Sequence, residues 1–108
     1  MQDNVKTAVY LAGKITGDPY FFSKFLDAEQ ALEAQGYAVL NPARLPQDCL
    51  PWMSYMRICF AMIDECSAVF FLPDWRESRG AIWEYGYAVA KGKTITILED
   101  NEKDMPSP

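Results

Sequence analysis

The sequence predicts one small α/β domain, in which a doubly wound parallel sheet of about four strands carries helices on both faces. Short, unbroken apolar runs alternate along the chain with segments long enough for a helix. These runs are rich in β-branched and aromatic residues, which is typical of strands buried on both faces of a parallel sheet. Strands separated by helices imply right-handed βαβ crossovers. The predicted architecture is Rossmann- or flavodoxin-like.

The first half of the chain contains two predicted strands and one helix. Residues 7–12 (TAVYLA) form the first expected strand. The helix that follows is expected to begin at Pro19, with Asp18 as its N-cap, because proline favours the first helical position and aspartate the cap. Apolar residues then recur at helical spacing until Gly36, a typical helix stop. Residues 37–40 (YAVL) form the second expected strand.

The second half repeats this alternation. Residues 43–51 are expected to form a proline-flanked loop, and residues 52–66 a helix with an aromatic and methionine stripe. Residues 68–73 (AVFFLP) are the third expected strand and the most hydrophobic segment. A helix over residues 79–91 and a strand over residues 94–100 complete the pattern.

Length and composition set the domain organisation. The chain has 108 residues, half of them hydrophobic, which is enough for one core. We expect residues 1–100 to form this domain and residues 101–108 to form a flexible tail. The N-terminal sequence MQDNVK has no apolar core of signal-peptide length, and no run approaches the roughly 18 apolar residues of a membrane span. These features predict a cytoplasmic protein without a membrane partner.

Charge and residue types exclude several functions. The net charge of −5 leaves no basic surplus for a nucleic acid polymer, although a single nucleotide needs only a few donors. The absence of histidine excludes serine–histidine and cysteine–histidine catalysis and histidine-ligated zinc. The three cysteines, Cys49, Cys59 and Cys66, form no C-x-x-C motif and are expected to be free, buried thiols in a reducing compartment.

Polar and glycine residues gather where the predicted strands end. The segments concerned are residues 13–17 (GKITG), Asn41-Pro42 and residues 74–80. In open parallel sheets, ligands bind beyond the carboxyl ends of the strands. The turn over residues 13–17 could present backbone N–H groups to an anion, but an ordinary turn that needs glycine explains it equally well.

The segment around residues 74–91 offers further candidates. Ser78 is a natural N-cap, and Arg79 could hold a phosphate or a carboxylate. Trp75 could stack on a base, or it could belong to a solvated loop. On helical spacing alone, Glu84 lies beside a core stripe formed by Ile82, Tyr85 and Val89, so that periodicity favours a solvated glutamate over a buried one.

Three segments together resemble the nucleoside 2-deoxyribosyltransferase-like superfamily. They are VYLAGKITG (9–17), NPARLP (41–46) and DWRESRGAIWEYGYAVAKGK (74–93), and the resemblance spans roughly residues 7–98. It is greatest to a short, mostly uncharacterised branch from phage and bacterial genomes, related to deoxynucleoside 5′-monophosphate N-glycosidases. The resemblance implies cleavage or transfer of the N-glycosidic bond of a (deoxy)nucleoside or its monophosphate, without a metal or cofactor.

The resemblance also assigns roles to residues of this chain. Glu84 stands where the family has its nucleophile, which attacks the anomeric carbon and forms a glycosyl-enzyme ester. This position favours a pocket-lining carboxylate. Tyr10 would lie under the sugar, and Ser78 would contact a 5′-phosphate. The substrate-binding residues expected in all are Tyr10, Gly13, Lys14, Ile15, Thr16, Gly17, Asp74, Trp75, Ser78, Arg79 and Gly80.

One departure from the family leaves more than one function open. Cys59 occupies the position of the family's second carboxylate, and a thiol cannot replace the geometry or charge of an aspartate. Asp64 and Asp74 are the candidates to substitute for it. The alternative to an enzyme is a non-catalytic nucleotide-binding module, a sensor or sequestering protein, with a pure interaction domain as a third and weaker option.

The resemblance further implies a homodimer or larger homo-oligomer, with Trp52 and Tyr55 as candidate interface residues.

Overall fold

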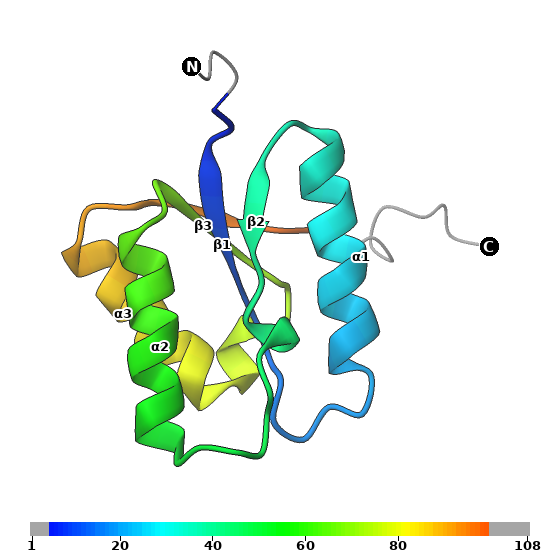
Figure 1. Ribbon diagram of the computed structural model, residues 1–108, viewed down its shortest axis with the longest axis vertical. Helices are drawn as coiled ribbons and strands as arrows, with labels where there is room; N and C mark the ends of the chain where they lie inside the picture. Colours follow the sequence, from blue (N-terminus) through cyan, green and yellow to red (C-terminus); the bar gives the residue numbers. More distant parts are fainter. Residues whose placement is uncertain (1–4, 100–108) are drawn as a thin grey trace.

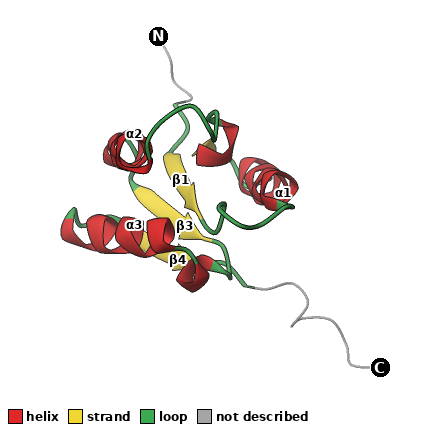
Figure 2. Ribbon diagram, turned by 90° about the horizontal axis from the view of Figure 1, so that it is seen from below, coloured by secondary structure: helices red, strands yellow, loops and turns green. Residues whose placement is uncertain are grey.

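The computed structural model describes residues 5–99, in which one parallel sheet lies between helices on both of its faces (Figures 1 and 2). The predicted tail over residues 101–108 lies outside this range. The elements in chain order are β1 (Ala8–Ala12), α1 (Phe21–Ala34), β2 (Ala38–Leu40), η1 (Pro42–Arg44), α2 (Trp52–Asp64), β3 (Ala68–Phe71), η2 (Trp75–Glu77), α3 (Arg79–Ala90) and β4 (Thr94–Ile97).

The strands follow the order β2-β1-β3-β4, and every neighbouring pair is parallel. The chain therefore starts in the middle of the sheet, builds outward to β2, and then crosses to the other side of β1 to place β3 and β4. Helix α1 covers one face, whereas α2 and α3 cover the other (Figure 2). The doubly wound parallel fold predicted from the sequence is confirmed.

The core consists of two layers, one on each face of the sheet. Val9 and Leu11 of β1 pack toward the α1 side, and Tyr10 and Ala12 pack toward α2 and α3. This alternation is the two-residue period of a strand. Strand β3 alternates in the same way, and Phe71 is fully buried on the α2–α3 side. The unbroken apolar runs thus fill both layers at once, as predicted.

The first helix starts two residues later than its cap signal predicts. Helix α1 begins at Phe21, and the Asp18 side chain makes no cap to the helix itself. Its Oδ1 instead accepts a hydrogen bond of 2.8 Å from the backbone N–H of Tyr20. Asp18 therefore stabilises the turn that precedes the helix, because aspartate side chains bond the backbone two residues on in turns as readily as at caps.

Candidate active site

A cavity of about 460 Å³ opens beyond the carboxyl ends of β1 and β3. The chain leaves β1 toward α1 on one face of the sheet and leaves β3 toward α3 on the other, so this is the switch point at which doubly wound sheets bind ligands. The volume lies within the range of small-molecule sites. The cavity is lined by Gly13, Ile15, Thr16, Gln47, Leu50, Trp52, Tyr55, Met56, Glu77, Ser78, Arg79, Gly80, Ala81 and Glu84.

Helix α3 turns Glu84 inward. Its buried residues are Ala81, Glu84 and Ala88, which share one face at helical spacing. The predicted core stripe is therefore wrong in two positions, since Ile82 and Val89 are exposed. Alanines on the buried face let α3 approach the sheet closely. Because α3 carries apolar residues on all sides, helical spacing does not indicate which face is buried. The solvated Glu84 that helical spacing alone favours is likewise wrong, because the residue is only 5% exposed; it lines the cavity, as the resemblance implies.

The Glu84 carboxylate accepts a hydrogen bond from a residue of strand β1. The Tyr10 hydroxyl, itself fully buried, donates a hydrogen bond of 2.7 Å to Glu84 Oε2. Burial raises the pKa of Glu84 to about 7, and the hydrogen bonds from Tyr10 and Cys59 act in the opposite direction. Burial, with the nearby Glu84 charge, raises the pKa of Tyr10 well above its ordinary value, so Tyr10 remains a donor. The cavity thus contains a carboxylate that changes charge near neutral pH.

Cys59 of α2 is the other neighbour of this carboxylate. Its side chain is fully buried, and burial followed by the Glu84 charge raises the pKa of the thiol to about 12. The thiol therefore stays protonated at neutral pH and can donate to Glu84, but it brings no negative charge. All three cysteines are free, and Cys59 and Cys66 are buried as predicted, but the prediction of a buried thiol is wrong for Cys49, which is exposed.

The turn after β1 lies directly against β3. A Cβ atom added to Gly13 would meet the side chain of Leu72 at 2.7 Å from Cδ1 and 2.9 Å from Cβ. Glycine is therefore required there by close approach. Gly17, four residues on, has φ of +83°, a conformation that residues with a Cβ rarely adopt. The glycines predicted to shape this turn do so for two different reasons.

A network of charges ties this turn to the loop after β3. Lys24 of α1 forms ion pairs with Asp18 and Asp74, and its Nζ donates to the Lys14 carbonyl at 2.9 Å. Asp74 Oδ1 accepts from the Lys14 backbone N–H at 3.1 Å. The Lys14 side chain pairs with Glu77 at 3.5 Å. Lys14 and Asp74 thus brace the two loops that flank the cavity and do not line it.

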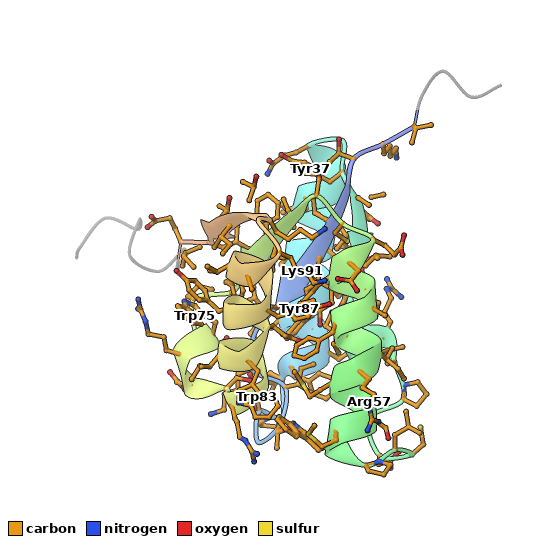
Figure 3. All side chains as sticks on the ribbon, turned by 90° about the vertical axis from the view of Figure 1, so that its left-hand side faces the viewer. Tyr37, Arg57, Trp75, Trp83, Tyr87 and Lys91 are labelled. Atoms are coloured by element: carbon orange, nitrogen blue, oxygen red, sulfur yellow. The ribbon has the colours of Figure 1, made fainter. Side chains whose placement is uncertain are left out.

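The N-terminus of α3 forms one wall of the cavity. Ser78 Oγ accepts from the Ala81 backbone N–H at 3.1 Å, which confirms the predicted N-cap. The Arg79 guanidinium lies over the Trp52 ring at 4.3 Å and near the Trp83 ring at 5.5 Å. Figure 3 shows Trp83 on α3, toward the end of the helix that faces the start of α2.

The structure brings six of the predicted residues to the cavity besides Glu84, namely Gly13, Ile15, Thr16, Ser78, Arg79 and Gly80. Tyr10 and Cys59 are fully buried and contact Glu84 without lining the cavity. The predicted residues Lys14, Gly17 and Asp74 also lie outside the lining. The expectation that Trp75 stacks on a base is corrected. Its indole is 8% exposed and stacks on Tyr85 at 4.7 Å within the core, because the apolar ring is buried when η2 folds back onto β3.

Several lining residues were not predicted as site residues. Gln47 and Leu50 come from the loop before α2, Met56 comes from α2, and Glu77 is the last residue of η2. Only Glu77 could have been found from the sequence, since it stands within the segment singled out for its place after a strand. Trp52 and Tyr55, the two candidate interface residues, both line the cavity, and the Tyr55 hydroxyl donates to the Pro42 carbonyl at 2.9 Å.

Within residues 5–99, no group of three or more histidine, cysteine, aspartate and glutamate side chains is arranged to hold a metal ion. None of the helices in the same range is both long and apolar enough to cross a membrane.

Comparisons with known proteins agree with this architecture. The family described as Domain of unknown function (DUF4406) matches residues 7–97. The solved structure of a 2-desoxiribosyltransferase from Leishmania mexicana superposes with a TM-score of 0.69 at 18% sequence identity. That alignment covers 85% of this chain and 63% of the other, so this chain spans less than two thirds of that protein's length. No curated protein gives a significant match. The likeness shows a deoxyribosyltransferase-like α/β fold.

Proposed function

The chain belongs to the family described as Domain of unknown function (DUF4406), and we propose that it cleaves or transfers the N-glycosidic bond of a (deoxy)nucleoside or nucleoside monophosphate. The observation that carries this proposal is the buried Glu84 carboxylate at the switch-point cavity, held by the Tyr10 hydroxyl at 2.7 Å. The deoxyribosyltransferase-like fold supports the same class of substrate.

Glu84 would act as the nucleophile. Its carboxylate attacks the anomeric carbon, the bond to the base breaks, and the bonding pair leaves with the base. The product is a glycosyl ester on Glu84. Attack by water then gives a hydrolase, and attack by a second base gives a transferase. A pKa of about 7 leaves a large share of Glu84 ionised at neutral pH, and its burial removes water that would otherwise solvate the attacking oxygen.

Tyr10 would orient the nucleophile. Its hydroxyl donates to Oε2 and fixes the position of the carboxylate. The hydrogen bond also favours the ionised form of Glu84, so that Tyr10 opposes the effect of burial. Substrate would enter between the turn over residues 13–16 and the start of α3.

A binding module without turnover is the second candidate, and a specific observation favours it. Cys59 contributes a neutral thiol where the related enzymes have a carboxylate. Neither aspartate considered as a substitute lines the cavity. Asp64 accepts a hydrogen bond from Tyr87, and Asp74 forms an ion pair with Lys24. Glu77 is the other carboxylate of the described lining, and it pairs with Lys14. A missing acid–base partner typically costs about 10²–10⁴ in rate.

Base release from a panel of deoxynucleosides and their monophosphates distinguishes the two functions. Wild-type protein is compared with Glu84→Gln, which keeps an acceptor for Tyr10 and loses the nucleophile, and with Asp64→Asn as a control remote from the cavity. Release by the wild type and by Asp64→Asn, but not by Glu84→Gln, supports the enzyme. Binding without release by any of the three supports the module.

A further inference from the structure

Lys24 of α1 uses all three N–H groups of its ammonium on acceptors from three different segments. Its Nζ donates to the Lys14 carbonyl at 2.9 Å and forms ion pairs with Asp18 and Asp74. Lys14 belongs to the turn after β1, Asp18 stands just before α1, and Asp74 follows β3. Because an ammonium has three donors, this set of contacts is complete. One side chain therefore joins the loops at the carboxyl ends of β1 and β3 to helix α1.

The two aspartates carry this contact to the backbone. Each of them binds Lys24 through one carboxylate oxygen and a backbone N–H through the other. Asp18 Oδ1 accepts from Tyr20 at 2.8 Å, and Asp74 Oδ1 accepts from Lys14 at 3.1 Å. The N–H and the carbonyl of Lys14 are thus both engaged, which fixes the peptide groups on either side of this residue.

The segments that Lys24 holds line the cavity, but Lys24 itself does not. Gly13, Ile15 and Thr16, which flank Lys14, are part of the lining, and so are residues 77–80, which follow Asp74. Lys24 lines a separate groove of about 610 Å³ beside α1. Any effect of Lys24 on a ligand in the cavity must therefore pass through the two loops.

Charge makes this contact more than a set of hydrogen bonds. The two aspartate carboxylates contact the same ammonium, so they lie close together and Lys24 offsets their mutual repulsion. The hydrogen bond with Lys24 is the largest cause of an Asp18 pKa below its ordinary value. Burial acts to lower the pKa of Lys24, but the hydrogen bonds with both aspartates outweigh burial and raise it. The ammonium thus stays charged at neutral pH, and without it two like charges would push the loops apart.

We propose that Lys24 is a positioning residue, which sets the place of the turn over residues 13–16 relative to the loop over residues 74–80 and thereby the affinity of the cavity for its ligand. The inference deepens the proposed function and rests on it only for the identity of the ligand. The nucleophile is held independently of Lys24, since Glu84 and Tyr10 contact each other from α3 and β1.

The test compares three variants with the wild type. Lys24→Met removes the ammonium and keeps most of the aliphatic chain. Lys24→Met combined with Asp74→Asn also removes one of the two facing charges, while the amide oxygen still accepts from Lys14. Lys93→Met is the matched control, because Lys93 Nζ also donates to two backbone carbonyls, at 3.2 and 2.7 Å, but lines neither cavity.

Three readouts separate position from chemistry. Hydrogen exchange of the Lys14 and Tyr20 amides, followed by NMR, needs no ligand. Calorimetry with deoxynucleosides and their 5′-monophosphates gives affinity, and base release gives KM and kcat. For Lys24→Met we expect both amides to exchange about tenfold faster and ligand affinity to fall by about tenfold or more. KM should rise while kcat changes much less, because the nucleophile keeps its contacts.

The added Asp74→Asn should restore part of the lost affinity, and Lys93→Met should match the wild type in all three readouts. Unchanged exchange in Lys24→Met, an equal loss of affinity in Lys93→Met, or a double variant no better than the single one would each overturn the inference. Lys24-dependent binding without base release would sustain it and defeat the proposed function. Base release with the same KM in wild type and Lys24→Met would defeat this inference alone.

Discussion

The Tyr10 hydroxyl and the Glu84 carboxylate form a buried hydrogen bond of 2.7 Å between residues 74 positions apart in the sequence. It joins the central strand β1 to helix α3, and both partners are almost completely buried. Because a hydrogen bond to a carboxylate favours its ionised form, the charge state of Glu84 depends on Tyr10.

Tyr10→Phe should raise the pKa of Glu84, because it removes a hydrogen bond that favours the ionised form. If Glu84 must be ionised, base release at neutral pH should fall by about tenfold per unit of pKa, and the rising limb of the pH–rate profile should move to higher pH. Tyr87→Phe is a matched control, because Tyr87 also donates to a carboxylate at 2.7 Å, that of exposed Asp64. An unchanged pH midpoint in Tyr10→Phe would contradict this role.

Glu84 should also make the fold less stable as pH rises. Its pKa is about 7 in the folded protein against 4.5 ordinarily, so unfolding releases a proton between these values. The free energy of unfolding should therefore fall from about pH 4.5 to pH 7 and level off above, by on the order of 2–4 kcal/mol. Glu84→Gln should abolish this decline. Urea denaturation of both proteins at a series of pH values measures it, and parallel curves would refute the prediction.

Glu29 should give the opposite pH dependence. It accepts two hydrogen bonds from Arg44, at 2.9 and 2.7 Å, and one from Asn41 at 2.9 Å. The bond to Arg44 is the largest cause of a pKa below the ordinary value. The stabilisation is complete above the unfolded pKa and is lost as pH falls through the folded one. Glu29→Gln should cost about 1–3 kcal/mol at pH 7, and its deficit relative to wild type should shrink on acidification. A deficit that is constant with pH would exclude this account.

Gly13→Ala should damage both stability and the site. The new methyl group would lie within 3 Å of Leu72 atoms, so the turn after β1 must shift. We expect a cost of about 1–3 kcal/mol and weaker ligand binding. Gly86→Ala is the control in the same fold, because a Cβ there meets nothing within 4 Å and replaces glycine in a helix. It should be neutral or stabilising by up to about 1 kcal/mol. Equal effects of the two substitutions would count against a steric requirement at Gly13.

The fold was predictable because its signals are local. The runs over residues 8–12 and 68–72 are apolar at every position, as expected of a strand with two buried faces. Gly36 and Gly92 follow helices with positive φ, and Ser78 caps α3 through its side-chain oxygen, so both kinds of helix end have a local signal. The placement of the site at the strand ends followed from the parallel topology alone.

The interior of the site was less predictable, because it depends on contacts between distant segments. Nothing local shows that Glu84 meets Tyr10, and helix α3 is apolar on too many sides for its buried face to be read from spacing. Trp75 stands in a charged segment, which suggested an accessible ring, but the fold of η2 packs this ring in the core. Gln47 and Leu50 reach the cavity from a loop that has no sequence signal for binding.

The covalent intermediate on Glu84 tests the central claim most directly. The protein is incubated with a 2′-fluoro deoxynucleoside 5′-monophosphate, in which the electron-withdrawing fluorine slows hydrolysis of the glycosyl ester, and peptides are then analysed by mass spectrometry. We predict a mass increase of one sugar phosphate on the peptide that contains Glu84, and none in Glu84→Gln. Release of base from the natural substrate by Glu84→Gln, or a sugar adduct on any other residue, would contradict the account.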